Sequence, residues 1–533
     1  MIGSPPAAGQ SALPKPRRGL ARASALTSVA AMLAVVSGLA LDVVIALSFG
    51  VGSTTDAFFV AARLPVGVVM VLLSGASLGL VPVFSRIRET HGAAGADAVS
   101  TSVLALVLLG GTAIATLVAL AAPAIVSLLA PGLDPQTLAT ASMLLRILVL
   151  VMPLTAWAEV LRSIANARDS FALPAAANIA LNLVAASFIL ATSHRGVVSA
   201  AWAYVAGGIA RIVVLVVWNL YLGWRPVWRA SGLGGWRDTT ARSALALSVR
   251  PSAGAGLAPL VRIVEGIFAS FLPVGSITIL NYGYRLIFAI SGTVVFRSIL
   301  GVLLPGLTRA AAAKDEATER RLTGQGIRAV VLLAGLLTGL LISLGEPGAA
   351  LIFNRGRVDP AQIAPLGFVL AGLALSLIPE GIQRTLQQPF YARLDTRSPL
   401  RNSLLGAGIN IALIPLLVAP FAGAQEALFG IVAAFVLADW IAAVDAWRRW
   451  RALTGHTLGI SRLAMALTAG IAVSVALGLA LSRWWGLSGR TDIVGVGLVG
   501  LASVLVGVVY FVVTVALDPA LARRARRRLK KRG

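Results

Sequence analysis

Long apolar stretches, separated by short polar connections, occupy almost the whole chain. A helix needs about 20 apolar residues to cross the hydrocarbon core of a bilayer, and fourteen stretches are long enough to do so. They cover approximately residues 26–49, 57–83, 100–129, 137–161, 172–193, 197–222, 243–272, 277–305, 326–353, 362–386, 400–420, 425–446, 461–482 and 493–517. The pattern therefore predicts an all-α membrane protein with about fourteen transmembrane helices.

The composition excludes a soluble globular protein and argues against an enzyme. Only 12% of the 533 residues are charged, whereas soluble domains average about 25%. The chain has no cysteine and only three histidines, which excludes thiolate metal sites and argues against a histidine metal site or a Ser-His-Asp triad. We therefore expect no catalytic residue, no metal and no cofactor, and a protein that binds and moves its ligand.

Basic residues concentrate in every second connection between the apolar stretches. If the N-terminus is cytoplasmic, the cytoplasmic segments hold 32 Lys and Arg residues and the opposite side holds five. This bias predicts that both termini of the multi-pass protein are cytoplasmic. The basic tail at residues 523–532 follows the last stretch directly, so we expect it to bind anionic lipids rather than nucleic acid.

The chain also contains an internal repeat. The motif P-x-[FL]-[ST]-R at residues 82–86 recurs at 305–309, and the pair Ala-Arg at 167–168 recurs at 392–393. The two motifs recur at nearly the same offset, and almost the same length of chain separates Arg63 from Arg285. Six helices fit in one period, which predicts two six-helix lobes related by a pseudo-two-fold axis along the membrane normal.

This repeat predicts the domain organisation. Helices 13 and 14 lie outside the duplication and are expected to be an appendage. The expected segments are a basic cytoplasmic tail at 1–25, an N-lobe with helices 1–6 at 26–222, a cytoplasmic linker at 223–242, a C-lobe with helices 7–12 at 243–450, helices 13–14 at 461–517, and a basic cytoplasmic tail at 518–533.

Several ionisable residues lie inside or at the edges of the predicted spans. An ionised side chain at the bilayer centre costs about 2.5 to 3.5 kcal/mol on insertion scales, so such groups are expected to face water or one another. We predict a cavity between the lobes, and arginine there suits phosphate, which it binds bidentately. The candidate substrate-binding residues are Asp42, Asp56, Arg63, Arg262, Glu265, Arg285 and Arg297.

Acidic residues in the spans are also candidates for binding a coupling ion. An ATP-binding loop motif is absent from the sequence, so an ion gradient or the membrane potential is expected to supply any energy. We consider Glu265, Glu380 and Asp42 as sites for a monovalent ion. The spacings Arg262/Glu265 and Glu380/Arg384 leave open that these residues are only neutralised pairs on one helical face.

Several sequence strings resemble the MurJ/MviN family of lipid II flippases. They are FGVGSTTDAFFVA at residues 49–61, IFASFL at 267–272 and FYARLDT at 390–396. The resemblance implies a multidrug/oligosaccharidyl-lipid/polysaccharide exporter fold, in which two lobes form a V around a central cavity and alternate access. It implies a cavity arginine at Arg285, whereas Val35 and Leu41 stand where the family pattern has arginines. It also implies that helices 13 and 14 form a groove for the lipid tail.

Three functions are compatible with these observations. The first is a flippase of a bacterial inner membrane that moves a polyprenyl-pyrophosphate-linked glycan, lipid II or a relative, for peptidoglycan synthesis. The second is a cation-coupled exporter of amphipathic small molecules. The third is a transport-inactive scaffold for envelope synthesis, which predicts that the charges within the membrane are dispensable. The oligomeric state is left open.

Overall fold

The computed structural model describes residues 18–69, 73, 76–227, 240–243, 245–246, 257–292, 297–421, 424, 426–456 and 461–518. All regular structure in these residues is helical. The first half contains α1 (Arg18–Phe49), α2 (Ser53–Ala62), the π-helix η1 (Arg63–Val68), α4 (Ala76–Leu120), α5 (Ala122–Leu129), α6 (Pro135–Leu148), α7 (Val151–Asn166), α8 (Ala172–Thr192) and α9 (Val198–Tyr221).

The second half of the chain is also helical. Its helices are α11 (Leu257–Ala269), α12 (Ser276–Ile290), α13 (Arg297–Ala312), α14 (Glu316–Phe353), α15 (Ile363–Ala374), α16 (Leu377–Ala392), α17 (Arg397–Val418), α18 (Ala427–Thr454), α19 (Ser461–Trp484) and α20 (Ile493–Leu517). Short 3-10 helices join several of them, including η5 (Pro360–Gln362) and η7 (Leu487–Gly489). We call α1–α9 the N-lobe and α11–α18 the C-lobe.

The described residues contain eleven helical segments that are long and apolar enough to cross a bilayer. This confirms the prediction of an all-helical, multi-pass membrane protein. The other three predicted spans, at 57–83, 243–272 and 277–305, each include residues outside the described ranges. The total of fourteen therefore stays a prediction, as do the two tails, which lie almost wholly outside the described residues.

Three of the predicted spans contain a helix break close to a proline. The span at 100–129 is divided at Ala121, just before Pro123. The span at 137–161 is divided before Pro153, and the span at 362–386 before Pro379. Proline has no N–H to donate to the carbonyl four residues earlier, and its ring clashes with that carbonyl. The helix therefore ends and restarts at these points.

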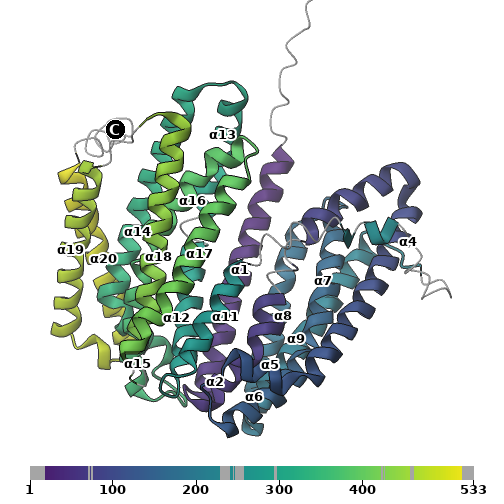
Figure 1. Ribbon diagram of the computed structural model, residues 1–533, viewed down its shortest axis with the longest axis horizontal. Helices are drawn as coiled ribbons and strands as arrows, with labels where there is room; N and C mark the ends of the chain where they lie inside the picture. The colour runs from purple at the N-terminus through teal and green to yellow at the C-terminus, as the bar shows by residue number, and fades with distance from the viewer. Residues whose placement is uncertain are drawn as a thin grey trace, which may run out of the picture.

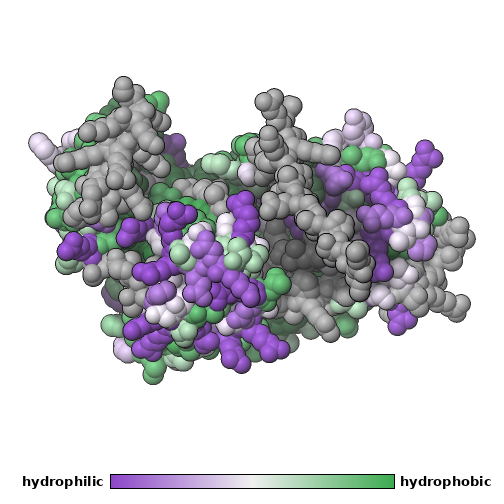
Figure 2. All heavy atoms as spheres, turned by 90° about the horizontal axis from the view of Figure 1, so that it is seen from above, coloured by the Kyte–Doolittle hydropathy of each residue, from purple (hydrophilic) through white to green (hydrophobic). Residues whose placement is uncertain are grey.

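The two lobes spread apart toward the upper end of the molecule and meet at the lower end (Figure 1). The main contacts between them join α1 to α12, α2 to α12, α5 to α11, η1 to α11 and α1 to α14. Helix α1 begins at the upper end, which the distribution of arginines predicts to be cytoplasmic. Figure 2 shows hydrophilic side chains on this upper face over both lobes, in agreement with the exposed Arg86, Arg88 and Arg309.

Helices α19 and α20 pack against α14 of the C-lobe. Small residues allow close approach at this contact, as is common between helices in membranes. A methyl group added at Gly335 would lie 2.5 Å from the Tyr510 hydroxyl oxygen. That hydroxyl donates a hydrogen bond of 2.8 Å to the Leu332 carbonyl. The appended helix pair is thus attached to the C-lobe by a polar contact and by close backbone packing.

Candidate functional site

The candidate site begins at an ion pair between the lobes. Asp42 of α1 pairs with Arg285 of α12, so each lobe contributes one charge. Asp42 is buried, whereas 34% of the Arg285 side chain is exposed. The Arg285 guanidinium also lies 5.9 Å from the centre of the Phe59 ring in α2. The arginine is therefore held in place on one side and accessible on another.

A second contact between the lobes lies at the lower end, where Asp56 of α2 caps a helix that belongs to the other lobe. The backbone N–H of Gly275 donates to Asp56 Oδ2 over 2.6 Å. The N–H and the hydroxyl of Thr278 both donate to Asp56 Oδ1, over 2.8 and 2.6 Å. Helix α12 has no cap from a side chain of its own. Asp56 therefore accepts hydrogen bonds from the donors at the N-terminus of α12, where a negative charge is also favourable.

Arg63 lies beside this contact, at the start of the π-helix η1. Its guanidinium lies against Gly266 of α11, so closely that a methyl group at that position would overlap it. Arg63 Nη1 also donates a hydrogen bond of 3.4 Å to the Leu129 carbonyl. Glu265, the neighbour of Gly266, is within electrostatic range of Arg63. A glycine at 266 is thus required for the close approach of the arginine.

Arg262 is surrounded by aromatic rings on the C-lobe side. Its Nη1 donates to Glu265 Oε2 over 2.6 Å. Its Cζ lies 3.3 Å from the centre of the Tyr284 ring and 4.8 Å from that of Phe435. Stacking on aromatic faces stabilises a guanidinium with few waters around it. Because 26% of the side chain stays exposed, Arg262 is both neutralised and accessible.

Three acidic residues of α11, α16 and α18 each have a buried oxygen without a partner among the described residues. These atoms are Glu265 Oε1, Glu380 Oε2 and Asp439 Oδ2. Glu380 Oε1 accepts from Arg384 over 2.7 Å, as its spacing suggested. Asp439 of α18 lies within electrostatic range of Glu265 and Glu380. Buried oxygens without donors are costly, so each of these acids is suited to hold a proton.

The structure thus brings five of the seven candidate substrate-binding residues to the contact between the lobes, and it places Arg262 beside them among residues of the C-lobe. The side chain of the seventh, Arg297, lies outside the described residues. Of the ion-site candidates, Asp42 and Glu265 lie at this contact, whereas Glu380 lies on α16 within the C-lobe. The sequence analysis did not identify the donors of Thr278 and Gly275. The short Gly-Ser-x-Thr string at the start of α12 could have indicated a helix end in need of a cap.

Other charges within the membrane pair inside one lobe. Glu159 of α7 accepts from Arg211 of α9 over 2.7 Å and also pairs with Arg162. Arg211 and Glu159 are both buried. These residues are neutralised and lie away from the contact between the lobes, so they are not part of the candidate site.

A polar recess of about 330 Å³ opens beside the Asp56 contact at the lower end. It lies where the first turns of α2 and α6 face the loop before α12. Its lining residues are Ser53, Thr54, Asp134, Gln136, Thr137, Thr140 and Val274. Asp42 and Arg285 do not line it, so the recess belongs to the outer edge of the contact and not to the predicted central cavity.

Comparison with known proteins identifies the family. A family model described as "Lipid II flippase MurJ" matches residues 45–504. The chain belongs to the MurJ family of lipid II flippases. It is 29% identical to the lipid II flippase MurJ of Burkholderia cenocepacia over 72% of this chain and 75% of that protein. It is 27% identical to the probable lipid II flippase MurJ of Rhizobium tropici over 93% and 94% of the two chains.

Solved structures show the same fold. A lipid II flippase MurJ in an inward closed conformation superposes with a TM-score of 0.74 at 20% identity, covering 93% of this chain and all of that one. An inward-facing multidrug resistance MATE transporter of the MOP superfamily gives 0.65 at 16% identity, covering 78% of this chain and 94% of that one. The predicted family resemblance is therefore confirmed.

Membership of the MurJ family also settles the broad class of activity. This MurJ-family chain is a membrane transporter of peptidoglycan synthesis and not an enzyme. Its family is one of multi-pass proteins of the bacterial inner membrane. The roles of Asp42, Arg285 and the other residues at the contact between the lobes are a separate question.

Proposed function

We propose that the protein moves a polyprenyl-pyrophosphate-linked glycan, lipid II or a close relative, from the cytoplasmic to the outer leaflet by alternating access. The observation that carries this proposal is the Asp42–Arg285 pair, which joins the lobes through an arginine that is one-third exposed. A pyrophosphate offers the bidentate oxygens that arginine binds best. The lipid tail stays in the bilayer while the headgroup enters between the lobes.

Cargo binding competes with an existing ion pair. When a phosphate takes the guanidinium of Arg285, the buried carboxylate of Asp42 loses its partner, and a buried unpaired charge is costly. The α1–α12 contact is then weakened by the cargo itself. Binding of the headgroup is in this way linked to separation of the lobes near Asp42.

The two lobes contribute equivalent residues to the contact, which supports the proposed pseudo-two-fold axis. Asp42 and Glu265 are separated by nearly the same length of chain as Arg63 and Arg285, and this length is the period of the internal repeat. A rotation about this axis would place Asp42 at the position of Glu265 and Arg285 at the position of Arg63. The Asp42–Arg285 pair would then correspond to the neighbouring residues Glu265 and Arg63. The helix breaks before Pro153 and Pro379 are spaced by almost the same length and fit the same operation. Two arginines placed by symmetry suit the two phosphates of one pyrophosphate.

The coupling ion is proposed to bind within the C-lobe. Glu265 and Glu380 are buried and carry the partnerless oxygens described above, with Asp439 nearby. A monovalent cation or a proton would satisfy these atoms. Glu265 also contacts Arg262, so occupation of this group would alter the charge beside the cargo.

The orientation that we propose places the upper end, with both termini, in the cytoplasm. The lobes spread apart at this end (Figure 1), which in the proposed orientation faces the leaflet in which the cargo is made. Anionic lipids are proposed as partners of the basic tails, because clusters of Lys and Arg beside a span attract them.

The direct test compares Arg285 variants in a strain depleted of the wild-type protein. Arg285→Ala is expected to leave the lipid-linked precursor in the inner leaflet, and Arg285→Lys to restore delivery only in part, because lysine cannot bind phosphate bidentately. The matched control is Arg195→Ala, at an exposed arginine just after the C-terminal end of α8. Normal delivery of lipid II to the outer leaflet with Arg285→Ala would overturn the proposal.

A second candidate is a cation-coupled exporter of amphipathic small molecules, which the acidic group within the C-lobe favours. This function predicts that Glu380→Gln lowers drug resistance and proton or sodium exchange without changing precursor delivery. The flippase function predicts instead that Arg285→Ala blocks precursor delivery without changing drug resistance or ion exchange. If neither variant changes any transport, the scaffold function is the one that remains.

A further inference from the structure

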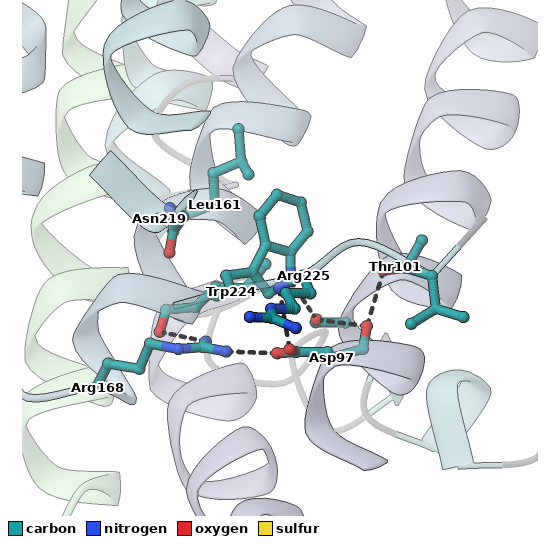
Figure 3. A network of polar contacts seen from close by, with 10 residues as sticks. Asp97, Thr101, Leu161, Arg168, Asn219, Trp224 and Arg225 are labelled. Carbon is teal, nitrogen blue, oxygen red and sulfur yellow. Dashed lines mark hydrogen bonds and ion pairs between the residues drawn. The ribbon is translucent and has the colours of Figure 1, made fainter. Parts of the chain in front are cut away.

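An ion pair at the upper end of the N-lobe ties together segments that are distant in the sequence. Asp97, in the upper part of α4, pairs with Arg168, which follows α7 (Figure 3). Both side chains are buried, with 5% and 8% of their surfaces exposed. We call this pair the Asp97 clasp. It lies far from the contact between the lobes and takes no part in the proposed cargo binding.

The C-lobe contains an equivalent pair, which we call the Glu319 clasp. Glu319 of α14 accepts from Arg393, which follows α16, over 2.9 Å. The two acids, and likewise the two arginines, are separated by the period of the internal repeat. Each arginine is followed by a residue with positive φ, 59° at Asp169 and 61° at Leu394. The Ala-Arg landmark of the repeat therefore marks a clasp in each lobe.

The two clasps differ in what else they hold. The Asp97 clasp also holds the chain that leaves α9 toward the C-lobe (Figure 3). The backbone N–H of Arg225 donates to Asp97 Oδ2 over 3.0 Å. The N–H of Val227 donates to Thr101 over 3.2 Å, and the indole of Trp224 donates to Ser100 over 3.0 Å. Three hydrogen bonds thus fix residues 224–227 on α4.

The turn that brings this segment onto α4 is itself well defined. Gly223 has a φ of 82°, which an L side chain rarely adopts. The N–H of Trp224 then donates to the Asn219 carbonyl over 2.9 Å. The Asn219 side chain in turn donates to the Leu161 carbonyl of α7 over 3.0 Å. The indole of Trp224 is buried, so the segment is held by packing as well as by hydrogen bonds.

The Glu319 clasp has no such additional segment among the residues that the structure describes. Glu319 Oε1 is buried without a partner there. Thr323, which corresponds to Thr101, donates to the carbonyl of Glu319 just as Thr101 donates to that of Asp97, but among the described residues no backbone N–H donates to Thr323 as that of Val227 does to Thr101. The C-lobe helix equivalent to α9 is α18, which stays helical as far as Thr454 and does not turn back. The segment held on the N-lobe is therefore specific to the connection between the lobes.

We propose that the Asp97 clasp makes residues 224–227 a rigid arm of the N-lobe, so that the first part of the connection moves with the N-lobe and not with the C-lobe. The buried carboxylate is the centre of this device, because one oxygen binds Arg168 and the other the Arg225 N–H. The Glu319 clasp holds only its own lobe together.

Hydrogen exchange of the full-length protein tests this proposal. The amides of Arg225 and Val227 are expected to be protected, and Asp97→Asn to speed exchange at Arg225 at least about tenfold, as loss of a hydrogen bond to a charged group predicts. Thr101→Val is expected to release the Val227 amide alone. Glu319→Gln is the matched control and should leave both amides unchanged.

Two outcomes would overturn the proposal that residues 224–227 form a rigid arm. One is unprotected Arg225 and Val227 amides in the wild-type protein. The other is Glu319→Gln accelerating their exchange as much as Asp97→Asn does, which would indicate general loosening. If Asp97→Asn fails to fold, Thr101→Val tests the proposal in its place, because this change removes one hydroxyl and keeps the Asp97–Arg168 ion pair.

Spin labels give a second, independent measurement, since the chain has no native cysteine. Labels at Glu89→Cys and Val227→Cys should give one narrow distance distribution, which broadens on addition of Asp97→Asn but not of Glu319→Gln. A broad distribution in the protein without Asp97→Asn would contradict the proposal. Neither measurement needs transport, so failure of the arm and failure of the flippase proposal are distinguishable.

Discussion

At the scale of single residues, the charges within the membrane divide by the partner that neutralises them. Asp42 and Asp56 find their partners in the opposite lobe, whereas Glu159 finds its partners in its own lobe. Only the first kind is broken when the lobes separate. In the proposed transport cycle, the role of a charged residue would therefore depend less on its type than on which lobe holds its partner.

Asp56→Ala is expected to loosen the lower end of the molecule. The change removes three hydrogen bonds to the start of α12, and loss of a helix cap costs about 0.5 to 2 kcal/mol. A Val274→Cys probe beside the contact should then react faster with a membrane-impermeant maleimide. Thr278→Ser, which keeps the hydroxyl, serves as the control. Unchanged reactivity with Asp56→Ala would show that the cap does not hold this end closed.

Because of Asp134, the stability of the first turn of α6 is expected to depend on pH. Hydrogen bonds from Thr137, and from the N–H of Gln136, lower the pKa of its carboxyl below the ordinary value of 3.8. Because the pKa of Asp134 is lower in the folded state than in the unfolded state, its ionised carboxylate stabilises the folded state at pH values above the unfolded pKa. This stabilisation is lost as the pH falls through the lower, folded-state pKa. Exchange of the Gln136 and Thr137 amides, corrected for intrinsic rates, should therefore lose protection in acid. Asp134→Ala should abolish this dependence, and a dependence that persists would assign it elsewhere.

At the scale of elements, the sequence predicted the helices, whereas it predicted only in part which prolines interrupt them. Apolar length alone indicated the spans, because a bilayer admits few alternatives. The interruptions before Pro123, Pro153 and Pro379 depend on whether neighbouring helices tolerate a bend, which the sequence does not reveal. The cap from Asp56 to α12 was hidden for a related reason, since it joins segments that are far apart in the sequence.

Gly335→Ala is expected to loosen the attachment of α19 and α20 to α14. The added methyl group would push the Tyr510 hydroxyl from its bond to Leu332, and overpacking of this kind costs about 1 to 3 kcal/mol. Gly348→Ala is the matched control in the same helix, because a methyl group there meets no atom within 4 Å. Thermal unfolding should separate the two variants. Equal melting temperatures would mean that the contact adapts without cost.

At the scale of the whole molecule, the sequence predicted the family, the membrane class and the pairing of Glu380 with Arg384. It also placed Asp42 and Arg285 in one site, because their helices open the two repeats. What it could not supply was which acid neutralises which base between distant segments of the chain. Asp42 lies closest in sequence to other N-lobe residues but pairs with Arg285, in the other half of the chain. Such pairings arise only when the lobes meet.

The orientation is testable in the cysteine-free chain. Arg355→Cys, at the lower end, is expected to react with an impermeant maleimide added outside intact cells stripped of their outer layers. Arg88→Cys, at the upper end, should react only after the membrane is opened. Both residues are exposed, so accessibility within the protein is matched. The opposite labelling pattern would invert the proposed topology and, with it, the direction of transport.

The cap that Asp56 places on α12 has a consequence for where the molecule can open. Two backbone amides, a hydroxyl and a carboxylate lose their partners together when α2 leaves α12, and only solvent can replace all four at little cost. This contact cannot be broken at low cost deep in the hydrocarbon, where water is absent. The polar recess beside it is open to solvent, so in the proposed transport cycle the headgroup would leave at the wet rim of the membrane and not at its centre.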